Sequence, residues 1–371
     1  MSHGGPVVAQ LANTQSTSSR IHASLASVVV VNHNGLAVID GCLASILGSD
    51  YPLLEVVVVD NASADGSLDL VVRKYGADSR LKVIANRQNL GFAEGCNKGA
   101  SKAEGEYLIF FNYDTEVEPD AIEKLVAALE ENASIGAAQS KLLMISDKKR
   151  LDGAGDFTSI VGWPYSRGRF EVDYGQYDSG TEIFGARGAA MIVRKSVFEE
   201  VGRFDSDYFM YYEDLDLSWR IRLRGYKILF VPDSVVYHLG GGLFEPKGPR
   251  GVLNNLYSGR NCIATLVKNL ELRNLVVYGS IHTFVHLSTI ILYLSERRVR
   301  EALGLMLALP RVVVDFPMMW KRRQAVQTFR VVSDKEIFGN VRKISIMDYV
   351  RSHVNRRILS RSAETARRTW R

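Results

Sequence analysis

The chain has 371 residues, of which 46% are hydrophobic and 23% are charged, and its net charge is +5. These values are typical of a folded protein with one large domain and a smaller region. Its three cysteines, Cys42, Cys96 and Cys262, lie far apart and form no C-x-x-C pair. Their spacing argues against a disulfide framework or a zinc site and indicates a reducing compartment.

The first twenty residues are polar and small, without an apolar run of signal-peptide length. We therefore expect residues 1–26 to form a disordered tail, and we expect no secretion.

Strands and helices alternate along residues 27–132. Residues 27–31 and 55–60 are continuous β-branched runs, typical of strands that helices cover on both faces. Further strands are predicted at 82–87 and 106–112, and helices at 35–52, 67–76 and 118–132. This alternation predicts an α/β fold with a doubly wound, mostly parallel sheet and helices on both faces.

Polar residues follow all four predicted strands. They are Asn32-His33-Asn34, Asp60-Asn61, residues 86–97, and Asn112-Tyr113-Asp114. Ligands of such sheets bind at the carboxyl ends of the strands, so the placement predicts a shared ligand site. Loops that leave a core are often polar in structural proteins too, and that alternative stays open.

The triplet Asn112-Tyr113-Asp114 raises the question of a metal. Enzymes that hold a metal against a diphosphate often end a strand with Asp-X-Asp, and here the first carboxylate is replaced by the amide of Asn112. One carboxylate makes a weak Mg²⁺ or Mn²⁺ site unless substrate phosphates and water complete the octahedron. The alternative is that Asp114 only caps the helix that starts near Pro119.

Five blocks, in this order, resemble family-2 glycosyltransferases of the GT-A fold, and within them the rhamnosyl- and galactofuranosyltransferase-like members. The blocks are "SVVVVNHNG", "VVVVDNASADGS", "NRQNLGFAEGCNKGA", "FFNYDTEVEPDA" and "YYEDLDLSWRIRLRGYKILFVPDSVVYHLGG". The resemblance implies a catalytic domain over residues 27–270. It also implies an inverting enzyme of the hexosyltransferase type, which moves a sugar from a nucleotide diphosphate sugar to a hydroxyl of a glycan or lipid-linked glycan.

Such transfer needs a cation or basic groups at the leaving diphosphate and a proton acceptor for the attacking hydroxyl. The resemblance implies Asp114 and His238 as ligands of Mg²⁺ or Mn²⁺, although a lone His is more often structural. It implies a donor site made of Asn32, His33, Asn34, Asp60, Asn61, Asn89, Gly91, Asn97, Asn112, Tyr113 and Asp114.

The resemblance also implies that Asp214 takes the proton of the acceptor and that Glu213 orients it or binds the acceptor. Both begin a predicted helix, whose positive dipole end favours a carboxylate. Arg187 and Gly188 are expected to line the acceptor side, with Asp205 at the approach to it. The alternative is that Asp60 and Asp214 are helix caps. We expect the remaining charges of the 211–227 segment, Asp216, Arg220 and Arg222, to form a solvated, ion-paired face.

The C-terminal third is apolar and basic. Residues 274–294 contain no charge, and residues 296–323 alternate an apolar face with basic clusters. We expect residues 271–330 to lie in a membrane interface and residues 331–371 to form a basic tail that binds anionic lipid. This predicts a cytoplasmic protein, peripheral on the inner face of the cell membrane. A true span, a soluble helical subdomain and a homo-oligomer are alternatives; no aromatic-basic platform indicates nucleic acid.

Other functions are alternatives to sugar transfer. A nucleotide-sugar-binding pseudoenzyme or partner subunit without turnover is favoured by Asn112. A nucleotidyltransferase would need a Gly-rich, basic loop after the first strand, and a Rossmann dehydrogenase would need G-x-G-x-x-G; "NHNGLAV" is neither. The absence of a Gln-X-X-Arg-Trp segment predicts addition of a single sugar.

Overall fold

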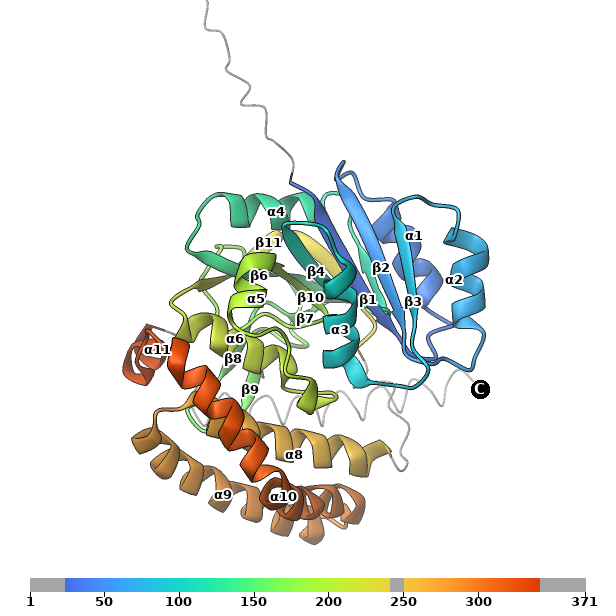
Figure 1. Cartoon of the computed structure of the whole chain (residues 1–371). Coiled ribbons are helices and arrows are strands. Elements are labelled where there is room, and N and C mark those ends of the chain that lie inside the picture. The colour runs from blue at the N-terminus through green and yellow to red at the C-terminus, as the bar shows by residue number, and fades with distance from the viewer. Residues whose placement is uncertain (1–23, 241–249, 341–371) are drawn as a thin grey trace, which may run out of the picture.

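The computed structural model of the protein describes residues 24–240 and 250–340 (Figure 1). Its nine-stranded sheet has the order β3-β2-β1-β4-β10-β6-β11-β5, with β7 paired to β6. The first four strands are β1 (Ala26–Asn32), β2 (Leu54–Asp60), β3 (Leu81–Ala85) and β4 (Tyr107–Asn112). They are mutually parallel and lie close to their predicted bounds.

Beyond β4 the sheet is mixed. The further strands are β5 (Thr115–Val117), β6 (Ile135–Met144), β7 (Asp147–Gly153), β10 (Ala190–Arg194) and β11 (Lys227–His238), and β8 (Asp156–Thr158) and β9 (Pro164–Ser166) form a separate hairpin. Strand β10 runs antiparallel to both β4 and β6, with Ala190 opposite Phe111. The loop before β10 therefore lies at the edge of the sheet where the four parallel strands end.

Helices cover both faces of the sheet, as predicted. The helices of this part are α1 (Ile39–Leu47), α2 (Ser67–Tyr75), α3 (Gly91–Lys102), α4 (Ala121–Glu130), α5 (Lys195–Glu200) and α6 (Glu213–Leu223). Alternate residues of β1 face opposite cores, so that Val29 packs with α3 and α6 and Val28 packs with α1 and α4. Both faces are therefore apolar, which explains the continuous valine runs.

Four helices follow the sheet: α8 (Arg250–Asn269), α9 (Leu272–Ser295), α10 (Val299–Phe329) and α11 (Asp334–Asn340). Helix α8 packs along α10 and against α6, and Figure 1 shows it between the sheet and α9. Helix α9 contains the uncharged segment 274–294, and most of the segment 296–323 lies in α10, which continues through Pro310 and Pro317. Residues 1–23 of the expected tail and 341–371 of the basic tail lie outside the described residues.

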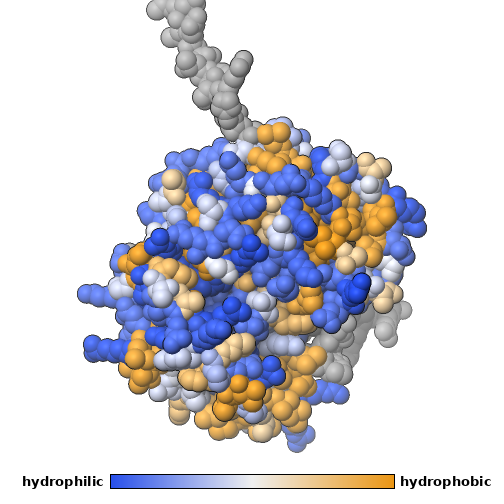
Figure 2. All heavy atoms as spheres, in the orientation of Figure 1, coloured by the Kyte–Doolittle hydropathy of each residue, from blue (hydrophilic) through white to orange (hydrophobic). Residues whose placement is uncertain are grey.

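Helices α9 and α10 are long and apolar enough to cross a membrane, judged by length and composition. Much of their apolar surface is exposed, and Figure 2 shows apolar side chains at the lower end of the molecule, where Figure 1 places these helices. The exposed apolar side chains of α9 and α10 include Val276, Ile281, Phe284, Ile291, Leu303, Met306, Val313, Val314 and Trp320.

Candidate active site

The ends of β1 and β2 are joined by a buried polar network. Asn32 stands opposite Asp60 in the parallel register, and its Nδ2 donates to Asp60 Oδ1 at 2.9 Å and to Ser67 Oγ at 2.8 Å. Asp60 also accepts from the backbone N–H of Ser63 at 3.0 Å. Because α2 begins at Ser67 and its N-cap is Gly66, Asp60 is not the cap of this helix.

The loops beside this network are tied to one another. His33 Nδ1 lies 2.8 Å from the carbonyl oxygen of Asn61, and Asn61 Nδ2 donates to the carbonyl of Gly91 at 2.8 Å. Asn89 Oδ1 accepts from the N–H of Gly91 at 2.8 Å. Asn34 adopts a φ of 56° and its Oδ1 accepts from the N–H of Ala64. The structure thus gathers the first three predicted donor loops at one edge.

Asn97 is placed differently from the other predicted donor residues. Its Nδ2 donates to the carbonyl of Phe204 at 2.8 Å, and its Oδ1 accepts from the N–H of Phe204 at 3.1 Å. The side chain therefore braces α3 against the segment that precedes α6. A contact between Asn97 and a donor stays a prediction.

Asn112, Asp114 and His238 come together where β4 ends. The antiparallel pairing of β11 with β5 sets His238 opposite Thr115. His238 Nε2 then lies 3.4 Å from Asp114 Oδ1 and 3.2 Å from Asn112 Nδ2. Helix α4 begins at Ala121 after Asp120, so Asp114 is not its cap. Tyr113, which lies between the two polar residues, packs against Gly35, where an added Cβ would come within 2.7 Å of its ring.

This arrangement fits a cation only with help from a ligand. Within residues 24–240 and 250–340, no group of three or more His, Cys, Asp or Glu side chains could hold a metal. Asp114 and His238 supply one oxygen and one nitrogen. His238 Nδ1 is held by Asp152 Oδ2 at 2.8 Å, which leaves Nε2 turned toward Asp114 in the manner of an oriented metal-binding histidine.

The charge of the His238 ring is set by the two carboxylates that face it. Burial alone would lower the pKa of His238, but the hydrogen bonds to Asp114 and Asp152 outweigh burial and raise this pKa to about 9. For Asp152, burial would raise the pKa, but Arg187 and Arg169 hold it well below its ordinary value. Asp152 was not singled out in the sequence, where "RLDGAGD" carries no motif.

Arg187 and Gly188 begin the loop that leads into β10. The guanidinium of Arg187 pairs with Asp152 Oδ2 at 2.8 Å and with Asp156 Oδ1 at 2.9 Å. The N–H of Gly188 donates to Asp214 Oδ2 at 3.1 Å. The structure thus places this predicted acceptor loop against the predicted proton acceptor, with two carboxylates holding the arginine in position.

Glu213 and Asp214 form the first turn of α6. Glu213 is buried, and its Oε2 has no hydrogen-bond partner among the described residues. Burial and the neighbouring Asp214 raise the pKa of Glu213 well above its ordinary value. Burial and Asp156 also raise the pKa of Asp214, while the N–H groups of Gly188 and Leu215 oppose this shift. A carboxylate with a raised pKa at a loop edge is suited to accept a proton near neutral pH.

The structure corrects the expectation of a solvated face on α6, because the charged residues of this face are buried. Asp216 is 0% exposed and Arg220 is 3% exposed, because α8 covers this side of α6. Asp216 pairs with Arg220 at 2.8 Å and with Lys268 of α8 at 2.9 Å. Arg222 is also buried and pairs with Glu182. These residues are ion-paired, as predicted, but inside the protein.

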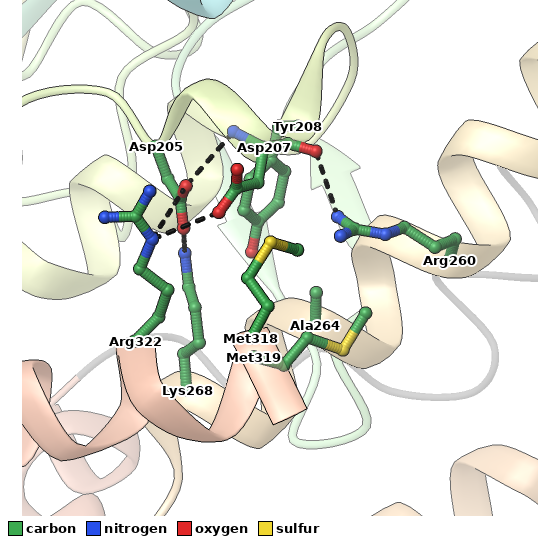
Figure 3. Close-up of a pocket in the computed structure, with 9 residues that line it drawn as sticks. All are labelled: Asp205, Asp207, Tyr208, Arg260, Ala264, Lys268, Met318, Met319 and Arg322. Atoms are coloured by element: carbon green, nitrogen blue, oxygen red, sulfur yellow. Dashed lines mark hydrogen bonds and ion pairs between the residues drawn. The ribbon is translucent and has the colours of Figure 1, made fainter. Parts of the chain in front are cut away.

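Side chains from α8 and α10 converge on the segment before α6 (Figure 3). Lys268 Nζ is 2.5 Å from Asp205 Oδ2, and Arg322 Nε is 3.0 Å from Asp207 Oδ2. Asp205 is therefore a buried member of an ion-pair network, whereas the sequence indicated the approach to a cleft. In the sequence, the sign of this network is a lone lysine in the apolar run "IATLVKNL".

Residues 27–202, somewhat less than half of the chain, match the family described as Glycosyl transferase family 2. An uncharacterized glycosyltransferase of Haemophilus influenzae is 33% identical over 144 residues, which are 39% of this chain and 42% of that protein. A poly-beta-1,6-N-acetyl-D-glucosamine synthase of Staphylococcus epidermidis is 24% identical over 228 residues, which are 60% of this chain and 52% of the synthase. The chain thus spans about half the length of the curated relatives that it matches.

Solved structures share the fold. GalNAc-T7, in complex with UDP, GalNAc and Mn²⁺, gives a TM-score of 0.59 at 19% identity and covers 90% of this chain and 58% of its own. The mannosyltransferase PcManGT from Pyrobaculum calidifontis, in complex with GDP-Man and Mn²⁺, gives 0.51 at 17% identity and covers 83% and 86%. The predicted GT-A fold is confirmed, whereas a rhamnosyl- or galactofuranosyltransferase subgroup is not. Together, the family match and the shared fold support a Glycosyl transferase family 2 domain over residues 27–202.

Proposed function

We propose that the protein is an inverting glycosyltransferase that moves one sugar from a nucleotide diphosphate sugar to a hydroxyl of a glycan or lipid-linked glycan. The observation that carries this proposal is the placement of Asp214. Its carboxylate, with a raised pKa, is held by the N–H of Gly188 at the loop edge where the four parallel strands end. We take residues 27–270 as the catalytic domain.

The donor site of this proposal is the strand-end network. Solved structures of the same fold contain UDP or GDP-Man together with Mn²⁺. Asp60 and Asn32, which hold each other in position, would contact the base or ribose, and the loops of His33 and Gly91 would line the same pocket.

Asp114 and His238 would hold the Mg²⁺ or Mn²⁺, with the donor phosphates as further ligands and with the cation in place of the proton on His238 Nε2. A bound cation would neutralise the charge that develops on the leaving diphosphate. The contribution of the chain is to fix the two ligands: Asp152 orients the ring of His238, and Arg187 in turn holds Asp152.

Proton transfer is assigned to Asp214. The oxygen of the acceptor hydroxyl would attack the anomeric carbon from the face opposite the diphosphate, which leaves, so that the configuration is inverted. During this attack the hydroxyl would give its proton to a carboxylate oxygen of Asp214. The N–H groups of Gly188 and Leu215 orient the carboxylate. Burial and Asp214 raise the pKa of Glu213 well above its ordinary value, which favours the charge of the pair on Asp214.

Membrane association belongs to the same proposal. The exposed apolar side chains of α9 and α10 and the length of both helices support binding at a membrane interface. We propose the inner face of the cell membrane as the place of action. High salt should release only part of the protein from membranes because apolar burial is not screened by salt. Complete release by salt alone would contradict interfacial helices.

The experiment is a panel of nucleotide diphosphate sugars incubated with the purified protein, with Mn²⁺ and with EDTA. Release of the nucleoside diphosphate from one donor, dependent on the metal and lost in Asp114→Asn, is the expected result. Full activity in EDTA would overturn the metal assignment. Because Asn112 replaces a carboxylate, a pseudoenzyme is the second candidate. Donor binding without any turnover, with an acceptor panel present, would favour it.

A further inference from the structure

The segment that leads into α6 has a backbone conformation that needs support. Phe209, Tyr211 and Tyr212 have φ values of 57°, 67° and 72°, in a region that residues other than glycine rarely adopt. Such residues cost free energy and persist where their surroundings hold them in place. The segment ends directly at Glu213 and Asp214, so its path sets where α6 begins.

One side chain of α8 contacts this segment at three points. The amide Nδ2 of Asn261, which is fully buried, donates to the carbonyl oxygens of Tyr208, Met210 and Tyr211, each at 2.9 Å. Asn261 Oδ1 accepts from Arg260 Nη1 at 2.9 Å. Asn261 therefore binds the backbone of the segment itself, and its own orientation is fixed by the neighbouring arginine.

The rest of the segment is held from the same helix and from α3. Lys268 pairs with Asp205 before the turn and with Asp216 after it, so one cation joins both sides (Figure 3 shows Lys268 with Asp205). On the other side, the N–H of Phe92 donates to the carbonyl of Phe209 at 2.6 Å. The strained turn is thus clamped between α8 and the start of α3.

We propose that Asn261 is a positioning residue for Asp214. By holding the carbonyls of Tyr208, Met210 and Tyr211, it sets the start of α6 so that the Asp214 carboxylate meets the N–H of Gly188. This inference rests on the proposed role of Asp214 as proton acceptor. Loss of the amide donors removes a hydrogen bond from each of the three carbonyls and lets the turn relax, which moves the carboxylate away from the reacting hydroxyl.

The test uses Asn261→Ala and Asn261→Asp in the full chain. The aspartate keeps the size of the side chain and the acceptor for Arg260 but removes the Nδ2 donor, and it serves if the alanine variant does not fold. We expect kcat for transfer to fall about 10- to 100-fold, while KM for the donor changes less than about twofold, because a misplaced group costs rate rather than donor affinity. A rise in KM with unchanged kcat would overturn the proposal.

A double-mutant cycle with Asp214→Asn identifies the route of the effect. If Asn261 acts through Asp214, then adding Asn261→Ala to Asp214→Asn causes no further loss of transfer. A further loss as large as in the wild-type background would overturn the proposal. Leu266→Ala is the matched control, because Leu266 is buried on the same helix and packs in the main core. It should lower thermal stability without lowering kcat.

Hydrogen exchange gives a readout that does not depend on transfer. In Asn261→Ala, exchange of backbone amides should accelerate in a peptide covering residues 205–216 more than in Leu266→Ala. Equal exchange in the two variants would show that Asn261 does not hold the segment, and it would overturn the proposal. Exchange can accelerate while Asp214→Asn transfers sugar normally. In that case Asn261 does hold the segment, but Asp214 is not the proton acceptor. The proposed role of Asp214 then fails, and the role of Asn261 in positioning a proton acceptor fails with it.

Discussion

The proposed donor side and the proposed acceptor side of the site are held in different ways. On the donor side, Asn32 and Asp60 are opposite each other in adjacent parallel strands, and short hydrogen bonds between neighbouring loops complete the network. On the acceptor side, Asp214 begins a helix whose approach is fixed by ion pairs and amide contacts from α8 and α10. The first arrangement follows from strand order, and the second depends on contacts between distant parts of the chain.

This difference predicts where the protein tolerates change. Loops at strand ends can vary while the sheet keeps its register, because the sheet is held by two large cores. The acceptor side instead contains buried charges, which are costly unless every partner is in place. Substitutions at Asp214, Lys268, Glu213 and the exposed face of α9 test this difference.

The largest expected effect is on the rate of transfer by Asp214→Asn. The amide keeps the shape and the contact with the N–H of Gly188 but cannot take a proton. We expect transfer to fall about 10²- to 10⁴-fold while the Kd for the donor stays near that of the wild type, as measured by initial rates and calorimetry. If Asp214 only accepted hydrogen bonds at the first turn of α6, which Tyr212 caps, asparagine would serve nearly as well and transfer would be nearly normal. Near-normal transfer would make Glu213 the next candidate.

The next effect is on stability, in Lys268→Met. Lys268 is 2% exposed and pairs with two buried carboxylates. Among the described residues, its loss leaves Arg322 as the ion-pair partner of Asp205 and Arg220 as that of Asp216. We expect the free energy of unfolding in urea to fall by about 3 kcal/mol, at the low end of values for broken buried pairs. Lys74→Met, which removes an exposed pair with Asp40, is the control and should change stability little. An equally small effect at Lys268 would contradict the buried network.

A smaller effect depends on pH and concerns Glu213→Gln. The folded pKa of Glu213 lies well above its ordinary value of 4.5, because burial and Asp214 disfavour its charged form. Between these two pKa values the folded state binds more protons than the unfolded state, so raising the pH through this window destabilises the wild type. Glutamine removes this penalty. The variant should gain stability relative to the wild type as the pH is raised above 4.5, measured by urea unfolding, and a difference independent of pH would contradict the shift.

The smallest effect on stability is expected for Phe284→Ser, because Phe284 is 71% exposed on α9. The free energy of unfolding should change by less than about 0.5 kcal/mol. Binding to vesicles that contain anionic lipid should fall about tenfold, since burying such a side chain contributes about 1.5–3 kcal/mol. Tyr174→Ser, at an exposed position between β9 and β10, should leave vesicle binding unchanged. Equal losses in both variants would argue against α9 as the membrane face.

Local sequence patterns were sufficient to predict the parallel strands, the helices on both faces and the position of polar residues at the strand ends. The physical reason is that β-branched runs covered on both sides and amphipathic helices are local patterns, and parallel strands bring their ends to one edge. The structure agrees with these expectations, since it pairs Asn32 with Asp60 and brings His238 close to Asp114. The specific role of each of these residues remains a prediction.

The surroundings of Asp214 depend on tertiary contacts that the local sequence does not predict. The antiparallel β10 brings Gly188 to it, and α8 buries Asp216 and Arg220, which the local charge pattern placed in solvent. Asn261 and Lys268 lie some fifty residues beyond the segment they hold, within a helix that reads as ordinary core. Contacts of this kind arise from packing between elements far apart in the chain, which no local periodicity encodes.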